Sequence, residues 1–356
     1  MKWHWALPGP LDQRTGGYRY DAQVVAALRA RGTALQVHPL VGRHPDPDAA
    51  AWAAADAVWR ESAAAGAGLV IDGLALPAFG PALAAGNHPG PVIALIHHPL
   101  ALETGLEPDQ ARRLDHWETQ ALERVDAVVV TSAATRAMLV ARGVAAARLH
   151  VALPGTDRPA RRLPRPPRRG PVRLLCVATL TPRKGHLRLL AALRGLRHLP
   201  WRLVCVGGER GAAGTARRIR ATRDRTGWRQ RVRLAGELDA RDLTQHYRQA
   251  DLFVFASRLE GYGMALAEAL AHGLPVVTTR GGAITQTVPA TTGMRVHGAD
   301  PRALRRALAQ ALGASRLRRR WAAQARRHRR RLGDWPATAA VFHTLMQTAG
   351  EAAHGG

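Results

Sequence analysis

Residues 251–277 read DLFVFASRLEGYGMALAEALAHGLPVV and contain a strand, a turn, a helix and a second strand. The apolar run at the start predicts a strand that ends near Ala256. A helix of about nine residues is predicted from near Met264, because Gly273 provides a C-terminal cap and Pro275 prevents continuation. The apolar run that follows predicts the next strand. A helix between two apolar strands is typical of a parallel sheet in an α/β domain.

The same alternation of apolar runs and helical segments recurs on both sides of a proline-rich stretch. Before it the runs are WHWALPG, ALQVHPL, GLVIDGL, PVIALIHH, DAVVVTS and HVALPG, and after it they are VRLLCVATL, WRLVCVGG, RVRLAGEL, DLFVFAS, LPVVTT and GMRV. Near-continuous apolar strands indicate parallel sheets covered on both faces. We therefore expect two consecutive doubly wound α/β domains, with ligands beyond the carboxyl ends of the strands.

The proline-rich stretch itself predicts a linker. It reads RRLPRPPRRGP over residues 161–171, and its four prolines and five arginines oppose any regular element. The length of 356 residues suits two domains of ordinary size.

Arginine gives the chain a strong positive charge. The formal net charge is +26 and the sequence pI is about 11.7, while lysine occurs only at Lys2 and Lys184. Five arginines lie in residues 161–169 and nine in residues 316–331. Such a charge favours acidic partners, but it fits an ordinary solvated surface as well as a patch for anionic lipid or nucleic acid.

The cysteines and the lengths of the apolar runs indicate the cellular compartment of the protein. Cys176 and Cys205 each lie inside a strand-like run, which favours buried, reduced thiols. No run approaches the roughly 18 apolar residues that a membrane span needs. The sequence therefore predicts a cytoplasmic protein, with peripheral contact to the inner face of the membrane as an open alternative.

Glu260 and Glu268 are the first candidate site residues. Glu260 precedes the predicted helix and Glu268 lies in its second turn, so both carboxylates can face one ligand at the helix start. The glycines there allow close backbone approach, and the first-turn amides favour an anion such as a diphosphate. The alternative is two unrelated surface charges, although Glu268 interrupts an apolar stretch.

Two cations follow another predicted strand in VATLTPRKGHLRLL, residues 177–190. Thr181 is expected to cap a helix whose first residue is Pro182. Arg183 and Lys184 then project at that end. Two solvated loop charges are the alternative.

The half of the chain before the proline-rich stretch contains weaker candidates for site residues. His97 and His98 directly follow the apolar run PVIALI. Gly16 and Gly17 lie in the first strand-to-helix loop, where amides can approach a phosphate or an acceptor. A structural histidine and a plain turn are the ordinary alternatives.

The spacing of Glu260 and Glu268 resembles the nucleotide-sugar signature of retaining glycosyltransferases with the GT-B fold, specifically glycosyltransferase family 4. The resemblance implies that Glu260 contacts hydroxyls of the donor sugar and that Glu268 holds the nucleotide ribose. It also implies that the loop between them meets the diphosphate or the sugar. That loop comprises Gly261, Tyr262, Gly263, Met264 and Ala265.

By the same resemblance, Lys184 neutralises the diphosphate leaving group with help from Arg183. The family's usual arginine stands earlier, where this chain has VATLT, and its Pro-Glu pair is replaced by Thr285-Gln286. A histidine near the reacting carbon is implied, for which His97 fits best and His98 second.

The resemblance also assigns the domains and the fold. Two Rossmann-like domains are expected to face a central cleft, an acceptor-side domain over residues 1–165 and a donor-binding domain over residues 166–334. A helix over residues 335–356 is expected to cross back to the first domain, anchored by Trp335. Gly16 and Gly17 are placed among the donor-binding groups.

The resulting hypothesis is a retaining glycosyltransferase that moves a sugar from an NDP-sugar to an acceptor hydroxyl. No metal and no cofactor are expected, since Asp46 and Asp48 stand among prolines and the sixteen histidines form no metal-spaced cluster with cysteine. A nonenzymatic sugar-nucleotide-binding relative remains an alternative. A nucleic-acid-binding protein fits less well, because no recognised module accompanies the arginines.

Overall fold

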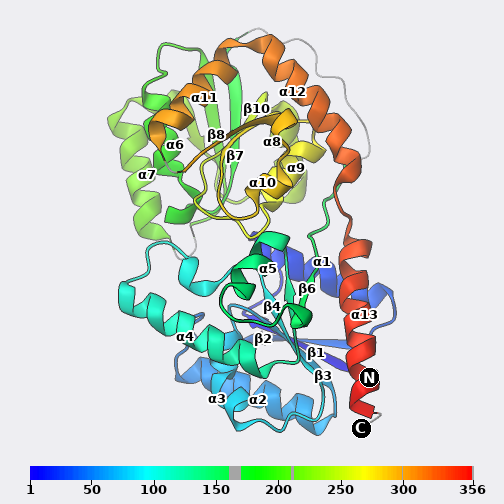
Figure 1. Ribbon diagram of the computed structural model, residues 1–356. Coiled ribbons are helices and arrows are strands. Elements are labelled where there is room, and N and C mark those ends of the chain that lie inside the picture. The colour runs from blue at the N-terminus through cyan, green and yellow to red at the C-terminus, as the bar shows by residue number, and fades with distance from the viewer. Residues whose placement is uncertain (160–169, 210–211, 299, 355–356) are drawn as a thin grey trace. The chain divides into compact units, whose positions relative to one another are not determined.

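The computed structural model describes residues 1–159, 170–209, 212–298 and 300–354. The chain folds as two units, one formed by Met1–Gly155 with Gly333–Gly356 and the other by Thr156–Leu332. Residues 161–169 of the predicted linker lie outside the described residues. Each unit is built on its own sheet (Figure 1).

The N-terminal unit contains six parallel strands in the order β2-β1-β3-β4-β5-β6. The strands are β1 (Trp3–Pro8), β2 (Leu35–Leu40), β3 (Gly68–Asp72), β4 (Val92–Ile96), β5 (Ala127–Val130) and β6 (Leu149–Val151). The helices are α1 (Gly16–Ala30), α2 (Ala49–Ala64), α3 (Gly80–Ala85), α4 (Pro108–Arg124), α5 (Ala133–Val140) and α13 (Trp335–His354).

Both faces of this sheet are buried, which explains why its strands are apolar without alternation. Leu69 and Ile71 of β3 belong to a core shared with α2, α3 and α4. Trp5 of β1 packs instead on Phe342 of α13, with ring centroids 5.4 Å apart. The C-terminal helix therefore completes the N-terminal unit, where α13 packs against α1 (Figure 1).

The C-terminal unit has six parallel strands in the order β12-β11-β10-β7-β8-β9. The strands are β7 (Val172–Val177), β8 (Trp201–Val206), β9 (Val232–Leu234), β10 (Leu252–Phe255), β11 (Val276–Thr279) and β12 (Gly293–Val296). The helices are α6 (His186–Arg194), α7 (Ala213–Arg225), α8 (Ala240–Gln249), α9 (Met264–Ala271), α10 (Ile284–Thr287), α11 (Pro301–Gly313) and α12 (Ser315–His328).

Within the described residues, the twelve apolar runs thus correspond to twelve strands, and the predicted doubly wound α/β architecture is confirmed. The two cysteines are buried free thiols on neighbouring strands, with Cys176 of β7 opposite Cys205 of β8. The strand order reverses beside β1 in one sheet and between β7 and β10 in the other. In sheets of this kind, ligands bind outside the carboxyl ends of the strands at such reversals.

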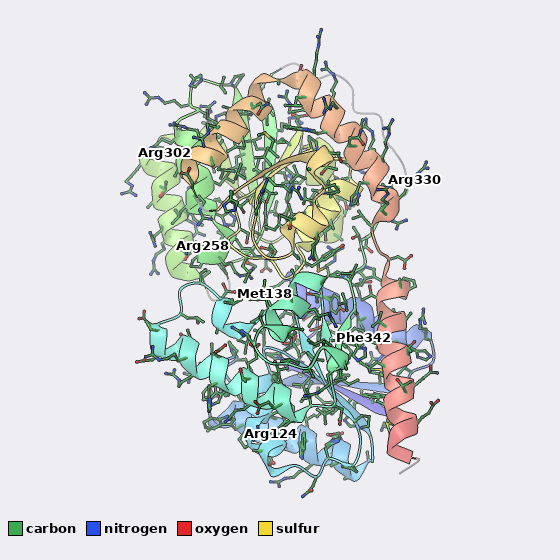
Figure 2. All side chains as sticks on the ribbon, viewed as in Figure 1. Arg124, Met138, Arg258, Arg302, Arg330 and Phe342 are labelled. Carbon is green, nitrogen blue, oxygen red and sulfur yellow. The ribbon has the colours of Figure 1, made fainter. Side chains whose placement is uncertain are left out.

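Tyr20 and Trp335 hold the ends of α1 and α13 together. Their rings meet edge to face with centroids 5.9 Å apart, and Tyr20 donates a hydrogen bond to the carbonyl of Ala152. Phe342 is fully buried on the side of α13 that faces the strands (Figure 2).

Replacing Phe342 with alanine should lower the free energy of unfolding of the N-terminal unit by about 3–5 kcal/mol, because a buried ring contact with Trp5 is lost and a cavity remains. The matched control is Gln347→Ala, on the exposed side of the same helix. Urea denaturation followed by tryptophan fluorescence measures both variants. Equal midpoints would mean that α13 does not belong to the core of this unit.

Candidate active site

The reversal between β7 and β10 brings together two loops that are far apart in the sequence. One follows β7 and contains a 3₁₀ turn, Pro182–Lys184. The other follows β10 and runs from Ala256 to Gly263, the residue that precedes α9. The predicted residues Arg183, Lys184 and Glu260 lie on these loops.

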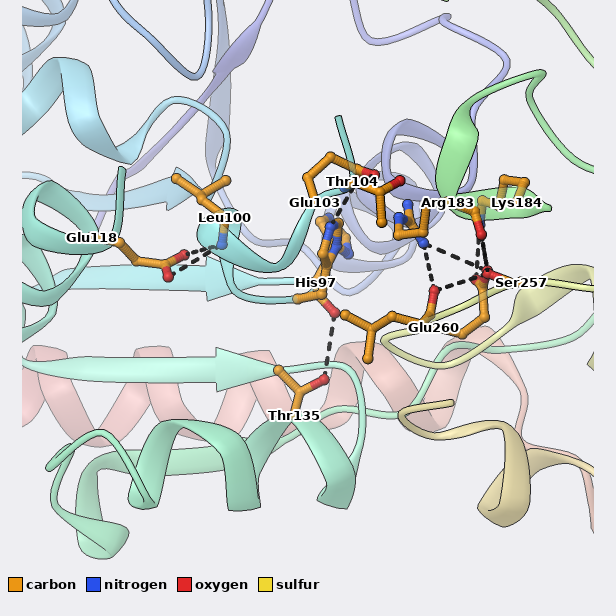
Figure 3. Close-up of polar contacts among 12 residues, drawn as sticks. His97, Leu100, Glu103, Thr104, Glu118, Thr135, Arg183, Lys184, Ser257 and Glu260 are labelled. Carbon is orange, nitrogen blue, oxygen red and sulfur yellow. Dashed lines mark hydrogen bonds and ion pairs between the residues drawn. The ribbon is translucent and has the colours of Figure 1, made fainter. Parts of the chain in front are cut away.

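Lys184 and Glu260 form a short, doubly hydrogen-bonded ion pair (Figure 3). Lys184 Nζ donates to Glu260 Oε1 at 2.7 Å and to Oε2 at 2.8 Å. Arg183 Nη1 lies 3.5 Å from Glu260 Oε1 and donates to the carbonyl of Leu259 at 2.7 Å. The two predicted cations therefore meet the first predicted glutamate directly.

All three side chains are largely withdrawn from water. The side chain of Glu260 is 8% exposed, that of Arg183 11% and that of Lys184 16%. Burial by itself would raise the pKa of Glu260, but the charges of Lys184 and Arg183 outweigh it and hold the pKa below its ordinary value. The cluster is therefore charged at neutral pH, and the interpretation of these residues as solvated loop charges is wrong.

The backbone fixes this arrangement through a close approach of the two loops. Gly185 has φ +72°, and a Cβ there would lie 2.0 Å from the carbonyl oxygen of Ala256. The amide of Arg258 donates to the carbonyl of Arg183 at 2.9 Å. Glu260 is held in turn by Gly281 and Ala283, through its amide and carbonyl.

The close contact of these two loops also changes where one predicted helix begins. The helix expected to begin at Pro182 begins at His186, after the 3₁₀ turn and the left-handed Gly185. Thr181 precedes the turn, and its buried hydroxyl makes no capping hydrogen bond. The contact of Gly185 with Ala256 leaves no room for an uninterrupted helix with a side chain at this position.

Glu268 is buried in the second turn of α9, which begins at Met264 as predicted. Tyr247 of α8 donates its hydroxyl hydrogen to Glu268 Oε2 at 2.8 Å. The Tyr247 ring stacks on His272 with centroids 4.8 Å apart. Glu268 is therefore no solvated surface charge either, but its carboxylate has a different described partner from that of Glu260.

The loop between the two glutamates is ordered against α10. Thr287 donates a hydrogen bond to the carbonyl of Tyr262, and Gly263 adopts φ +91° immediately before α9. Gly261, Tyr262, Met264 and Ala265 are each partly exposed. Their backbone thus lies at the N-terminus of α9, where helix amides favour anions.

A second cluster forms in the N-terminal unit at the carboxyl ends of β3 and β4. His97 follows β4, and its Nε2 lies 3.2 Å from Asp72 Oδ2 and 3.6 Å from Asp21 Oδ1. Gly17, in the first turn of α1 next to Gly16, approaches the same ring, since a Cβ there would lie 3.4 Å from His97 Nε2. His98 instead pairs with Glu103, its Nε2 3.5 Å from Oε2. Of the two histidines, His97 is thus the one beside Gly17.

The charges in this cluster are strongly coupled. Burial would lower the pKa of His97, but Asp21 and Asp72 outweigh it and raise the pKa to about 10. Burial and the neighbouring Asp72 raise the pKa of Asp21 to about 7, against the opposing effect of His97. The two carboxylates therefore favour the protonated form of His97.

Sequence reasoning missed Asp21, Asp72 and Tyr247. Asp21 had a detectable signal, because it lies four residues after Gly17 and so shares its side of α1. Asp72 is the last residue of an apolar strand, which is where sites form in parallel sheets. Tyr247 carried no local signal, since its role depends on the packing of α8 against α9.

The acidic pair Asp46 and Asp48 lies in a loop, as predicted. Asp48 caps α2 by accepting from the amide of Ala51 at 3.0 Å, and Asp46 pairs with Arg113. Among the residues that the structure describes, two groups have metal-like composition: Asp21, Asp72 and His97, and separately His4, His38 and Glu61. The absence of a metal therefore stays a prediction.

Two family models match the chain. One, described as Glycosyltransferase Family 4, matches residues 17–158, and the other, described as Glycosyl transferases group 1, matches residues 171–314. The first match lies in the N-terminal unit except for its last residues, and the second lies in the C-terminal unit. Each matched segment contains one of the two clusters of charged residues described above.

Curated relatives match part of their length. A D-inositol 3-phosphate glycosyltransferase from Xylanimonas cellulosilytica is 35% identical over 170 residues, which cover 46% of this chain and 41% of that protein. A protein of the same name from Corynebacterium glutamicum is 32% identical over 193 residues, covering 50% and 46%. The chain thus spans less than half the length of these relatives.

Solved structures match over nearly the whole chain. Sucrose-phosphate synthase from Thermosynechococcus elongatus has a TM-score of 0.82 and 22% identity, with 99% of each chain covered. Anabaena HepE in complex with UDP-glucose has a TM-score of 0.73 and 16% identity, covering 98% of this chain and 100% of the other. The GT-B fold is therefore confirmed. None of the described helices has both the length and the apolar character needed to span a membrane.

The buried ion pair makes a prediction about stability. Glu260→Gln keeps the side-chain shape but leaves Lys184 without its carboxylate, so we expect the free energy of unfolding at pH 7 to fall by about 3 kcal/mol. Since the pKa of Glu260 is lowered by folding from its ordinary 4.5, this contribution is present above that pH and is lost as the pH falls through the lowered value.

Urea denaturation from about pH 7 to about pH 3 measures this contribution. The difference between wild type and Glu260→Gln should narrow toward acid pH. Asp242→Asn, which removes an exposed carboxylate of the same unit, is the matched control and should follow wild type. A difference independent of pH would show that the charge of Glu260 is not what stabilises the loops.

Proposed function

Because this chain belongs to glycosyltransferase family 4, we propose that it is a retaining glycosyltransferase that moves a sugar from an NDP-sugar to an acceptor hydroxyl. The contact of Lys184 and Arg183 with Glu260 carries the proposal. It lies at the sheet reversal where α/β domains bind ligands, and it offers cations for a diphosphate beside an acceptor for sugar hydroxyls.

The proposed roles follow from the chemistry of each group. Lys184 and Arg183 stabilise the charge that develops on the departing diphosphate. Glu260 accepts hydrogen bonds from hydroxyls of the donor sugar, because a carboxylate can accept two at once. Glu260 also holds Lys184 in place before the donor arrives, so that little reorganisation is needed during the reaction.

Glu268 and the N-terminus of α9 are proposed to hold the nucleotide. The hydrogen bond from Tyr247 fixes the direction of the Glu268 carboxylate, which suits it to accept from ribose hydroxyls. The backbone from Gly261 to Ala265 then meets the diphosphate or the sugar, favoured by the helix dipole. Arg183 takes the place of the arginine that the family carries earlier in this loop.

Retention is proposed to occur by attack on the same face from which the diphosphate leaves. Sequence reasoning identified no nucleophile near His97, and the structure places two carboxylates there. Asp21 and Asp72 are buried, however, and both face the imidazole. They are therefore poorly placed to form a covalent bond to a sugar, and an oxygen of the leaving group takes the acceptor proton instead.

The donor class is the first point to test. HepE was crystallised with UDP-glucose, and a relative from Corynebacterium glutamicum is described as GDP-mannose-dependent. A thermal-shift panel of UDP-, GDP- and ADP-sugars should show stabilisation by one class. Mixing that donor with candidate hydroxyl acceptors should release NDP, and proton NMR of the product gives the anomeric configuration.

Two variants should separate binding from turnover. Glu268→Ala should weaken nucleotide binding about tenfold to a hundredfold, because hydrogen bonds to a charged group are lost. Lys184→Ala should mainly lower turnover, by about a hundredfold or more, because leaving-group stabilisation is lost. Calorimetry with the NDP and steady-state kinetics measure the two effects.

Asp242→Asn and Arg302→Ala are matched controls for these variants, since both residues are exposed in the same unit. Unchanged kinetics in both Glu268→Ala and Lys184→Ala would refute the site. Tight NDP-sugar binding without transfer or donor hydrolysis would favour a nonenzymatic relative.

The arginine-rich helix supports a proposed contact with an anionic membrane surface. Arg318 and Arg329 bind backbone carbonyls, and the other seven arginines of residues 316–331 are exposed, including Arg330 (Figure 2). Clustered exposed cations are attracted to anionic lipid by about 1 kcal/mol each.

Co-sedimentation with vesicles should show binding to phosphatidylserine-containing bilayers that fades as salt rises. A variant with Arg326, Arg327 and Arg330 changed to glutamine should bind less. The control variant carries glutamine at Arg112, Arg113 and Arg124 of α4. Equal binding to neutral vesicles would contradict the proposal, and salt-sensitive binding to RNA alone would favour a nucleic-acid partner.

A further inference from the structure

Two elements, α1 and β3, contribute groups that meet the ring of His97. From α1 come Gly17 and the buried Asp21, and from the end of β3 comes the buried Asp72. Tyr20 of α1 meets the ring edge to face, with centroids 5.3 Å apart. The carbonyl of His97 accepts from the hydroxyl of Thr131 at 3.1 Å.

Two buried carboxylates at one imidazole require a compensating proton. Asp21 is 1% exposed and Asp72 is 3% exposed, while the His97 side chain keeps 20% of its surface accessible. Two negative charges so close together in a poorly hydrated site would repel each other strongly. A proton on the imidazole nitrogen that lies 3.2 Å from Asp72 and 3.6 Å from Asp21 reduces this penalty.

We propose that Asp21 and Asp72 are positioning residues that keep His97 doubly protonated and fixed in direction, so that it serves as a hydrogen-bond donor and not as a base. This inference rests on the proposed function and on the histidine that the family resemblance implies near the reacting carbon. The imidazolium then donates to a hydroxyl of the donor or acceptor, and the acceptor proton goes to the leaving group.

The other titratable groups nearby are consistent with this assignment. The pKa of Tyr20 is raised by burial and by Asp21, so its hydroxyl stays neutral and donates to Ala152. His44, in the loop after β2, lies near enough to Asp72 to feel its charge, but burial lowers the pKa of His44. His98 has its own carboxylate, Glu103. The charge that faces His97 is thus that of Asp21 and Asp72.

A substitution at Asp72 can replace the hydrogen-bond acceptor that faces His97 with a hydrogen-bond donor. Its Oδ1 accepts from the amide of Leu74 at 2.9 Å, while its Oδ2 faces His97. In Asp72→Asn the side-chain carbonyl can keep the bond to Leu74, and the amide nitrogen then faces His97. Because that nitrogen only donates, it opposes a proton on the ring nitrogen and leaves Asp21 as the one carboxylate facing it, so the neutral imidazole is favoured.

The direct test is the protonation state of His97 in the full chain, measured by long-range proton–nitrogen NMR on histidine-labelled protein. His97→Gln identifies the signals. Wild type should show an imidazolium well above the ordinary histidine pKa of about 6.5, and Asp72→Asn should show a neutral ring at the same pH. Glu103→Gln, which removes the partner of His98, is the matched control and should leave His97 unchanged.

A kinetic readout complements the spectrum. The alkaline limb of the kcat/KM profile should move to lower pH in Asp72→Asn, with activity at about pH 8 reduced roughly tenfold relative to wild type. If Asp72→Asn does not fold, Asp21→Asn should show the same direction of change in both measurements.

A neutral His97 in wild type at pH 7 would overturn the proposal, as would an Asp72→Asn variant that folds and keeps the imidazolium. So would a metal ion removed by chelator with a change in the His97 signals, because a bound cation would then replace the proton. The spectrum requires no substrate. If the protein transfers no sugar but His97 is an imidazolium, the proposed function is refuted. The proposal that Asp21 and Asp72 keep His97 protonated is then still supported.

Discussion

The ion pair of Lys184 with Glu260 is the interaction on which the C-terminal site depends. It joins two loops separated by 76 positions in the sequence, at the sheet reversal between β7 and β10. A buried charge without a partner costs several kcal/mol, so neither residue is stable there alone. The requirement explains why Gly185 must be a glycine, since only a residue without Cβ lets the lysine loop come this close to Ala256.

The N-terminal cluster also pairs buried charges with groups of opposite sign, but it contains more carboxylates than cations. The C-terminal cluster has two cations around one carboxylate, whereas the N-terminal cluster has two carboxylates around one imidazole. In both, glycine at a loop or first helical turn permits the close approach, and the strands of a parallel sheet deliver the charged groups to one edge. The first cluster suits an anionic ligand. The second suits a directed donor of hydrogen bonds.

The sequence predicted the strands well because parallel strands buried on both faces are apolar throughout, and that pattern is local. Glu268 was also detectable locally, since a charge inside an apolar helix needs a partner. That partner, Tyr247, could not be predicted, because it comes from another helix. The start of α6 was predicted too early for the same reason: Pro182 is a good first residue, but the carbonyl of Ala256 decides where the helix begins. Asp21 and Asp72 carried local signals that were missed, but their common contact with His97 appears only when α1, β3 and β4 are brought together.

A crystal structure with a bound NDP-sugar tests the central claim most directly. We predict that Lys184 Nζ donates to a diphosphate oxygen at about 2.7–3.2 Å, that Glu260 accepts from a sugar hydroxyl, and that Glu268 accepts from the ribose. A nucleotide bound in the C-terminal unit without contact to Lys184, Glu260 or Glu268 would contradict the assignment of this cluster as the donor site.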